Sequence, residues 1–280
     1  MLWDTHMHTS FSTDSEAQPA AMAEEAIRRG LKGICITDHL DYDYPSQDAS
    51  SSAAGAGSET EPEFLLDVDA YLPAMTALQE KYADKLPIRI GIELGLQPHL
   101  AERHAELLAQ YSFDFVIGSS HVVHGMDPYY PVYYEGRTEA AAYREYFESI
   151  LENIGAFQDF DVYGHIDYVV RYGPNQNREY TYRRYADIID EILKKLVGLG
   201  KGIEINTAGF YYGLGHPNPT EDIIRRYREL GGEIITIGSD GHAPERIGYD
   251  FGKVPDILRE AGFKYYTVFR GRKGEFVPIP

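Results

Sequence analysis

Cysteine is almost absent from this sequence, since Cys35 is the only one in 280 residues. A single cysteine cannot form an intrachain disulfide, which excludes the small disulfide-rich domains typical of secreted proteins. Cys35 lies within the apolar run Gly33–Thr37. We therefore expect a buried core thiol here and not a catalytic nucleophile.

Long apolar runs are absent as well. No segment approaches the roughly 18 consecutive apolar residues of a membrane-spanning helix, which argues against association with a membrane. The first residues, Met1–His6, lack the basic and apolar segments of a secretory signal. These features favour a cytoplasmic protein.

Basic residues are scarce relative to acidic ones: 26 Lys and Arg stand against 44 Asp and Glu, for a net charge of −18. An acidic surface repels backbone phosphates, so nucleic acid is not an expected partner. A small phosphorylated substrate would meet the same repulsion unless cations offset it locally. Three bound divalent ions would add about six positive charges in one cleft.

Short apolar runs alternate with amphipathic segments along the chain. The runs are rich in β-branched and aromatic residues, as expected of strands buried on both faces. They are Met1–Asp4, Gly33–Thr37, Ile88–Leu94, Phe115–Ser119, Val162–Gly164, Gly202–Asn206 and Glu233–Ser239. The predicted helices between them are Pro19–Arg29, Val68–Ala83, His99–Ala109, Thr138–Phe157, Tyr182–Leu199 and Thr220–Leu230.

Strands that alternate with helices predict a parallel sheet with helical crossovers. Seven strands are one short of the regular eightfold barrel. We therefore predict an α/β fold, a distorted seven-stranded TIM-like barrel, with an open doubly wound sheet as the alternative.

We predict one domain over residues 1–280, in which two segments break the alternation. Residues 46–62, reading SQDASSSAAGAGSETEP, have the composition of a flexible insertion. This segment is either a lid over a site or a plain surface loop. The tail Tyr265–Pro280 predicts a peripheral strand.

Six of the ten histidines directly follow predicted strands. In barrels of parallel strands the active site forms at the carboxyl ends, where successive loops converge. Neutral imidazole is the commonest metal ligand in proteins, so this convergence predicts a metal site. The six are His6, His8, His39, His121, His165 and His242.

Three carboxylates accompany these histidines. Glu93 lies inside the apolar strand Ile88–Leu94, where a carboxylate costs several kcal/mol unless it is paired or binds metal. A bridge between two cations is its best explanation. Asp240 follows the seventh strand, whereas Asp14 lies in the loop after the first and could instead stabilise a turn.

Nine nitrogen and oxygen donors exceed the four to six ligands of one ion, so two or three divalent ions are predicted. Mixed imidazole and carboxylate ligands without thiolate favour zinc, manganese or iron.

These motifs, in this order, resemble those of the polymerase and histidinol phosphatase (PHP) family. The matching segments are Asp4–His8, Ile36–His39, Gly91–Glu93, Gly118–His121, Gly164–Asp167 and Gly238–His242. Within the family, the chain is most similar to the stand-alone histidinol-phosphate phosphatases of histidine biosynthesis. The resemblance implies a metal-dependent phosphate monoester hydrolase, with a three-ion site on a distorted barrel.

The resemblance also implies a role for each ligand. The first ion takes His6, His8, Glu93 and Asp240; the second shares Glu93 and adds His121 and His165; the third takes Asp14, His39 and His242. Glu93 and Asp240 are the implied catalytic carboxylates. Many relatives carry histidine where this chain has Asp14, which keeps a ligand and changes its charge.

Substrate contacts follow less directly from the motifs. Arg171 resembles a catalytic arginine that binds the phosphate in this family. The alternative interpretation is that Arg171 is an ordinary surface residue. Relatives often carry a basic residue after Glu-Ile-Asn-Thr-x-Gly, but the corresponding segment Glu204–Tyr212 has none. Arg246 is a candidate for the missing charge.

Other functions remain open. They are a PHP phosphoesterase acting on another small phosphate or a nucleotide, a protein-tyrosine phosphatase, an amidohydrolase that cleaves C–N bonds, and an interaction module without activity. The pairs Tyr129-Tyr130 and Tyr133-Tyr134 either line a pocket for a ring or pack beneath a loop.

Overall fold

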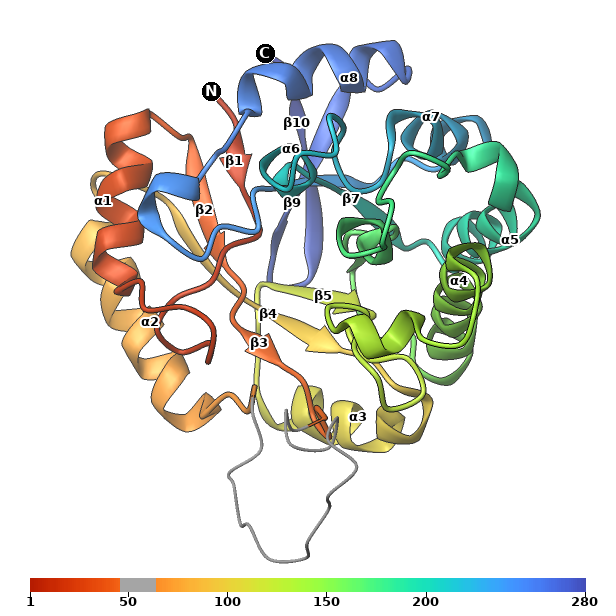
Figure 1. Cartoon of the computed structure of the whole chain (residues 1–280). Coiled ribbons are helices and arrows are strands. Elements are labelled where there is room, and N and C mark those ends of the chain that lie inside the picture. Colours follow the sequence, from red (N-terminus) through yellow and green to blue (C-terminus); the bar gives the residue numbers. More distant parts are fainter. Residues whose placement is uncertain (46–63) are drawn as a thin grey trace, which may run out of the picture.

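A ring of parallel strands surrounded by helices dominates the computed structural model, which describes residues 1–45 and 64–280 (Figure 1). The strands are β1 (Trp3–Asp4), β2 (Gly33–Ile36), β3 (His39–Leu40), β4 (Ile88–Gly95), β5 (Phe115–Ser119), β6 (Val162–Tyr163), β7 (Gly202–Asn206) and β8 (Ile235–Gly238). They pair in the order β1-β2-β4-β5-β6-β7-β8, and every pair is parallel.

The short strand β3 continues β2. Both pair with β4 in the same register, since Ile36 lies opposite Ile90 and His39 lies opposite Glu93. They are therefore two pieces of one interrupted strand, and seven strands surround the barrel axis.

Backbone hydrogen bonds between the first and last strands close the ring. The N–H of Thr5 donates to the carbonyl of Ile237 at 2.8 Å, and the N–H of Asp240 donates to the carbonyl of His6 at 2.8 Å. A parallel bridge between Met7 and Gly241 extends the contact. The predicted distorted seven-stranded barrel is confirmed, and the open sheet is wrong because the edges of β1 and β8 pair with each other.

Helices surround the ring, with the short α6 (Ala208–Tyr211) inward of the others, directly after the end of β7 (Figure 1). They are α1 (Pro19–Arg29), α2 (Val68–Tyr82), α3 (Ala101–Gln110), α4 (Glu139–Ala156), α5 (Ala186–Gly198), α6, α7 (Glu221–Glu229) and α8 (Val254–Glu260). The six predicted helices are present, α1 with the predicted bounds and the other five with one or both ends shifted, and Tyr182–Tyr185 forms a 3-10 turn before α5. The sequence did not predict β3, α6 and α8, which are too short for a clear hydrophobic period.

The tail forms two antiparallel strands, β9 (Tyr265–Arg270) and β10 (Lys273–Pro278), where one peripheral strand was predicted. The ring of Phe269 stacks on that of Phe115 with centroids 5.1 Å apart. Arg272 donates its backbone N–H to the carbonyl of Asp114, immediately before β5. The hairpin therefore closes the barrel at the amino ends of the strands.

Cys35 is buried in a small cluster inside the barrel, with Phe115, Ile117, Val162 and Phe269. Burial raises the pKa of its thiol well above the usual value, which disfavours the nucleophilic thiolate. The expectation of a core thiol is confirmed.

Two further predictions, the insertion and the single domain, are not tested by the structure. The insertion predicted at 46–62 lies outside the described residues, and the single domain stays a prediction. Among the helices that are described, none combines the length and apolar character needed to cross a membrane.

His104 yields a prediction on stability and pH. It is buried against the rings of Tyr42 and Phe157, and burial lowers its pKa to about 4 from 6.5. The unfolded chain therefore takes up a proton first as the pH falls, and stability is lost between about pH 6.5 and pH 4. Between pH 7.5 and pH 5, the free energy of unfolding of the His104→Leu protein should fall by about 2 kcal/mol less than that of the unmodified protein. Urea unfolding at the two pH values measures both.

A surface histidine provides the control for this measurement. His99 has a side chain that is 60% exposed, so His99→Gln should keep the acid sensitivity of the unmodified protein. Equal acid sensitivity in the His104→Leu protein would refute the assignment.

Candidate metal centre

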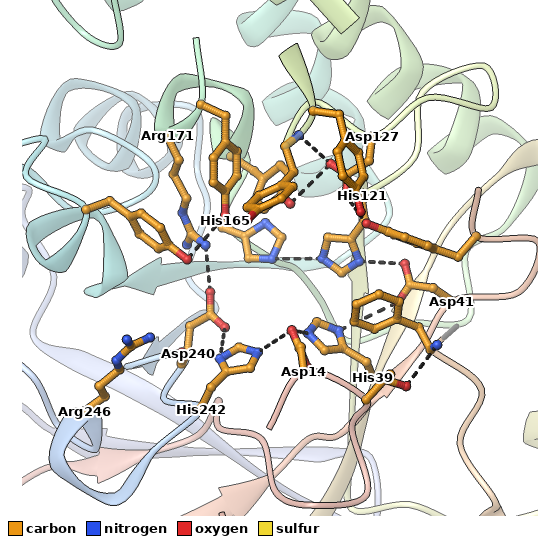
Figure 2. Close-up of a pocket in the computed structure, with 18 residues that line it drawn as sticks. Asp14, His39, Asp41, His121, Asp127, His165, Arg171, Asp240, His242 and Arg246 are labelled. Carbon is orange, nitrogen blue, oxygen red and sulfur yellow. Dashed lines mark hydrogen bonds and ion pairs between the residues drawn. The ribbon is translucent and has the colours of Figure 1, made fainter. Parts of the chain in front are cut away.

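All nine predicted ligands meet at the carboxyl ends of the strands. The segment after β1 supplies three of them, the segment after β8 supplies two, and each of the other four comes from a different strand or strand end. Six of the nine line one pocket, which Figure 2 shows. The nine are His6, His8, Asp14, His39, Glu93, His121, His165, Asp240 and His242. The remaining histidines, His99, His104, His124 and His216, do not join this cluster.

Glu93 lies at the centre and divides the cluster between its two oxygens. Oε2 lies 3.1 Å from Nε2 of His6 and 3.5 Å from Nε2 of His8. Oε1 lies 2.9 Å from Nε2 of His165 and 3.4 Å from Nε2 of His121. Two separate pairs of imidazoles thus face one carboxylate, as a bridging ligand requires.

Asp14 and Asp240 face the outer imidazoles. Asp14 Oδ2 lies 3.1 Å from Nε2 of His242 and 3.8 Å from Nε2 of His39. Asp240 Oδ1 lies 3.3 Å from Nε2 of His8. The ring of His8 packs against those of His39 and His242, with centroids 4.0 and 4.1 Å away.

The cluster carries excess negative charge. Burial lowers the pKa of His6, but the surrounding carboxylates, led by Glu204, outweigh burial and hold that pKa well above its usual value. Burial raises the pKa of Glu93, yet the imidazoles around it, led by His6, hold it well below its usual range. Burial and neighbouring imidazoles hold the pKa of His8 well below its usual value, so its ring stays in the neutral form that binds metal. Charge that holds protons in this way also attracts metal ions, which displace them.

The described donors fit divalent metal ions. Nε2 of His6 faces Nε2 of His8 at 3.1 Å, and Nε2 of His121 faces Nε2 of His165 at 3.4 Å. When the proton of each ring is on Nδ1, the lone pairs of these Nε2 atoms face each other, which suits a shared cation better than a hydrogen bond. Asp41 also has a buried Oδ2 with no hydrogen-bond partner among the described residues. Such an oxygen is costly to bury without a cation nearby.

The backbone at the end of β8 leaves room for the side chains of the cluster. A methyl group at Gly238 would collide with the side chains of His6 and Glu204. Asp240 adopts a left-handed conformation with φ of 54°, which is rare outside glycine and asparagine-like residues. The motif Gly-Ser-Asp-Gly-His therefore uses an unusual backbone conformation to place the Asp240 carboxylate within the cluster.

Arg171 is buried beside the cluster, so it is not a surface arginine. Its Nη1 donates to Asp240 Oδ2 at 2.9 Å, Nη2 donates to Asn206 at 3.1 Å, and Nε donates to Asn218 at 2.8 Å. A guanidinium has five N–H donors, so two remain for a ligand in the pocket that Arg171 lines.

The pocket above the cluster has a volume of about 430 Å³ and a largely aromatic wall. Tyr129 and Tyr130 line it, whereas Tyr133 and Tyr134 are buried beneath the loop. Each interpretation of the tyrosine pairs therefore holds for one pair. Arg246 also lines the pocket, on the same side as Arg171 and Asp240 in Figure 2.

Comparison with known proteins identifies the family. Residues 4–208 match the PHP domain. This chain belongs to the PHP family. It is 31% identical to the histidinol-phosphatase of Lactococcus lactis, covering 96% of this chain and 95% of that protein, and 35% identical to a probable histidinol-phosphatase of Clostridium acetobutylicum, covering 94% and 95%.

Solved structures of the family share the fold. The crystal structure of histidinol phosphate phosphatase from Lactococcus lactis, complexed with zinc, L-histidinol and phosphate, has a TM-score of 0.87 and covers 98% of this chain and all of that chain. A putative histidinol phosphatase of Listeria monocytogenes, 20% identical, has a TM-score of 0.74 and covers 90% and 99%.

Two carboxylates of this PHP domain orient its imidazoles, and neither was predicted as a site residue. Glu204 Oε1 lies 2.7 Å from Nδ1 of His6, and Asp41 Oδ1 lies 2.7 Å from Nδ1 of His121. A proton held on Nδ1 leaves Nε2 free for a metal. Glu204, an acid within an apolar strand, carried the same signal as Glu93; Asp41 carried none.

Glu204→Gln tests this orienting role. The amide is a weaker partner for the His6 N–H, so affinity for divalent ions should fall about 10- to 100-fold. The measurement is competition with a chelator, read by metal analysis of the purified protein. Glu179→Gln, an exposed acid on the surface, is the matched control, and equal metal affinity in both variants would remove Glu204 from this role.

Proposed function

We propose that this protein is a metal-dependent phosphate monoester hydrolase whose substrate is histidinol phosphate. One observation carries the proposal: nine candidate metal ligands cluster at a pocket, six of them in its lining, in a chain that aligns over nearly its whole length with a histidinol-phosphatase. That relative's crystal structure holds zinc, L-histidinol and phosphate. We propose zinc, manganese or iron as the metals here, and the cytoplasm as the location.

The donor groups define where divalent ions would bind. His6, His8 and Glu93 form one set, and Glu93, His121 and His165 form a second. Divalent ions at such sites lower the pKa of water and neutralise charge on a phosphoryl group. Glu93 links the two sets, because each of its oxygens faces one of them.

The protein's own groups orient the ester. Arg171 keeps two N–H donors for the phosphoryl oxygens, and its ion pair with Asp240 holds the guanidinium in place. Held in this way, the phosphorus is presented for in-line attack, and charge that develops on the nonbridging oxygens is stabilised. The aromatic side chains of the wall fit the imidazole ring of the leaving group.

Removal of a central ligand should abolish catalysis. Without His6 or Glu93 the metal sets lose the donors they depend on, so His6→Ala and Glu93→Ala should each lower kcat at least about 1,000-fold. The assay compares histidinol phosphate and p-nitrophenyl phosphate with zinc, manganese and iron added separately, alongside metal analysis. Undiminished activity in either variant contradicts the mechanism.

Arg171→Lys tests the phosphate contact while keeping the positive charge beside Asp240. Lysine lacks the planar fork of arginine, so kcat/KM for histidinol phosphate should fall about 100-fold. Arg225→Lys, which changes an exposed arginine paired with Asp222, serves as the control. A loss of only a few-fold in the Arg171 variant would show that this residue does not contact the phosphate.

A phosphotyrosine substrate is the second candidate, because the aromatic wall would also accept a phenol ring. Assay of a phosphotyrosine peptide against histidinol phosphate separates the two. The proposed function predicts the higher kcat/KM for histidinol phosphate.

A further inference from the structure

Asp127 lines the pocket on the side opposite Arg171 and Arg246, as Figure 2 shows. It is 4% exposed. Its carboxylate accepts hydrogen bonds from the Tyr44 hydroxyl, from the backbone N–H of Tyr129 at 2.7 Å and from the Tyr168 hydroxyl at 3.5 Å. All three described donors are neutral.

The other carboxylates that line this pocket have cationic or titratable partners. Asp240 pairs with Arg171, Asp41 with His121, and Asp14 with His242. Among residues 1–45 and 64–280, no Lys, Arg or His nitrogen lies within ion-pair distance of Asp127. A buried carboxylate without a cation is costly, and among the four described carboxylates that line this pocket Asp127 alone bears that cost, at a place open to a ligand.

The surroundings of Asp127 suit an organic cation. Tyr44 and Tyr168, whose hydroxyls donate to its carboxylate, also line the pocket, and aromatic faces attract ammonium groups. The phosphate end of an ester would lie at Arg171 and the metal-binding donors, on the other side of the pocket. The pocket is thus polarised to take an ester that is anionic at one end and cationic at the other.

We infer that Asp127 binds the positively charged amine of the leaving alcohol and so selects cationic phosphate esters. This inference rests on the proposed function, since histidinol carries an ammonium group two carbons from its phosphorylated oxygen. O-phosphoethanolamine has the same spacing, and ethyl phosphate differs from it only in lacking the amine.

The test is the ratio of kcat/KM for O-phosphoethanolamine over ethyl phosphate, and for histidinol phosphate over p-nitrophenyl phosphate, in the metal-loaded enzyme. The unmodified enzyme should favour the cationic ester of each pair at least tenfold. In Asp127→Asn, which keeps the side-chain size and an acceptor oxygen, both ratios should fall at least tenfold, and the inhibition constant of histidinol should rise about tenfold.

Several outcomes would overturn the inference. A purely structural Asp127 would lower all four kcat/KM values by the same factor and leave the ratios intact. Equal rates of the unmodified enzyme on ethyl phosphate and O-phosphoethanolamine would refute it even if the variant folds poorly. Asp43→Asn, an exposed acid outside this pocket, is the matched control and should keep both ratios.

Failure of the proposed function is distinguishable. An enzyme that does not hydrolyse histidinol phosphate, yet prefers O-phosphoethanolamine to ethyl phosphate through Asp127, would refute the substrate and support the subsite.

Arg246 carries a second inference on independent grounds. In a chain with 44 acidic residues, this guanidinium pairs with no carboxylate among the described residues. Its Nη2 donates to the Tyr211 hydroxyl at 2.5 Å, and its carbon lies 4.0 Å from the centroid of that ring. Tyr211 belongs to the segment after β7 that lacks a basic residue, and its contact with Arg246 brings a guanidinium from the segment after β8 to that segment, at the pocket.

We propose that Arg246 binds a phosphoryl oxygen of the substrate and of the product. In Arg246→Gln, the inhibition constant of inorganic phosphate should rise about tenfold, and Arg246→Lys should restore part of the affinity. Arg225→Gln is the control. The proposal would be overturned if the inhibition constant of phosphate changed less than threefold in Arg246→Gln, or changed equally in Arg246→Gln and Arg225→Gln.

Discussion

The burial of Glu93 is the constraint on which the site depends. A fully buried carboxylate in the middle of a barrel strand is stable only when positive charge surrounds it. Imidazoles from the loops after β1, β5 and β6, and from β3, supply the donors that face its two oxygens. The closed ring of parallel strands makes this possible, because it brings the carboxyl ends of distant segments within a few ångströms.

A second layer of carboxylates holds the first in register. Glu204 and Asp41 fix the protons of His6 and His121, and Arg171 ties Asp240 to Asn206 and Asn218. These contacts determine which nitrogen of each ring faces the cluster before any ion binds. The centre is therefore preorganised by groups other than the metal-binding donors themselves.

The pocket extends this arrangement with opposite charges on its two walls. Arg171 and Arg246 lie on one side, and Asp127 lies on the other among tyrosine rings. An acidic protein with a net charge of −18 thus presents local positive charge where a phosphate would bind. An ester with charges of both signs matches this polarity better than a simple anion does.

The sequence alone determined the alternation of strands and helices, because the hydrophobic period of each segment is a local signal. That alternation predicted the barrel, and the histidines after the strands predicted which end of it carries the ligands. Glu93 was predicted because an acid in an apolar strand is anomalous by itself. Only the tertiary structure decided that Asp41 orients His121, that Arg171 is buried, and that Asp127 has neutral hydrogen-bond donors and no cationic partner among the described residues. Each of these depends on which side chains from other loops lie nearby, and charge pairing between segments more than 40 residues apart leaves no trace in local composition.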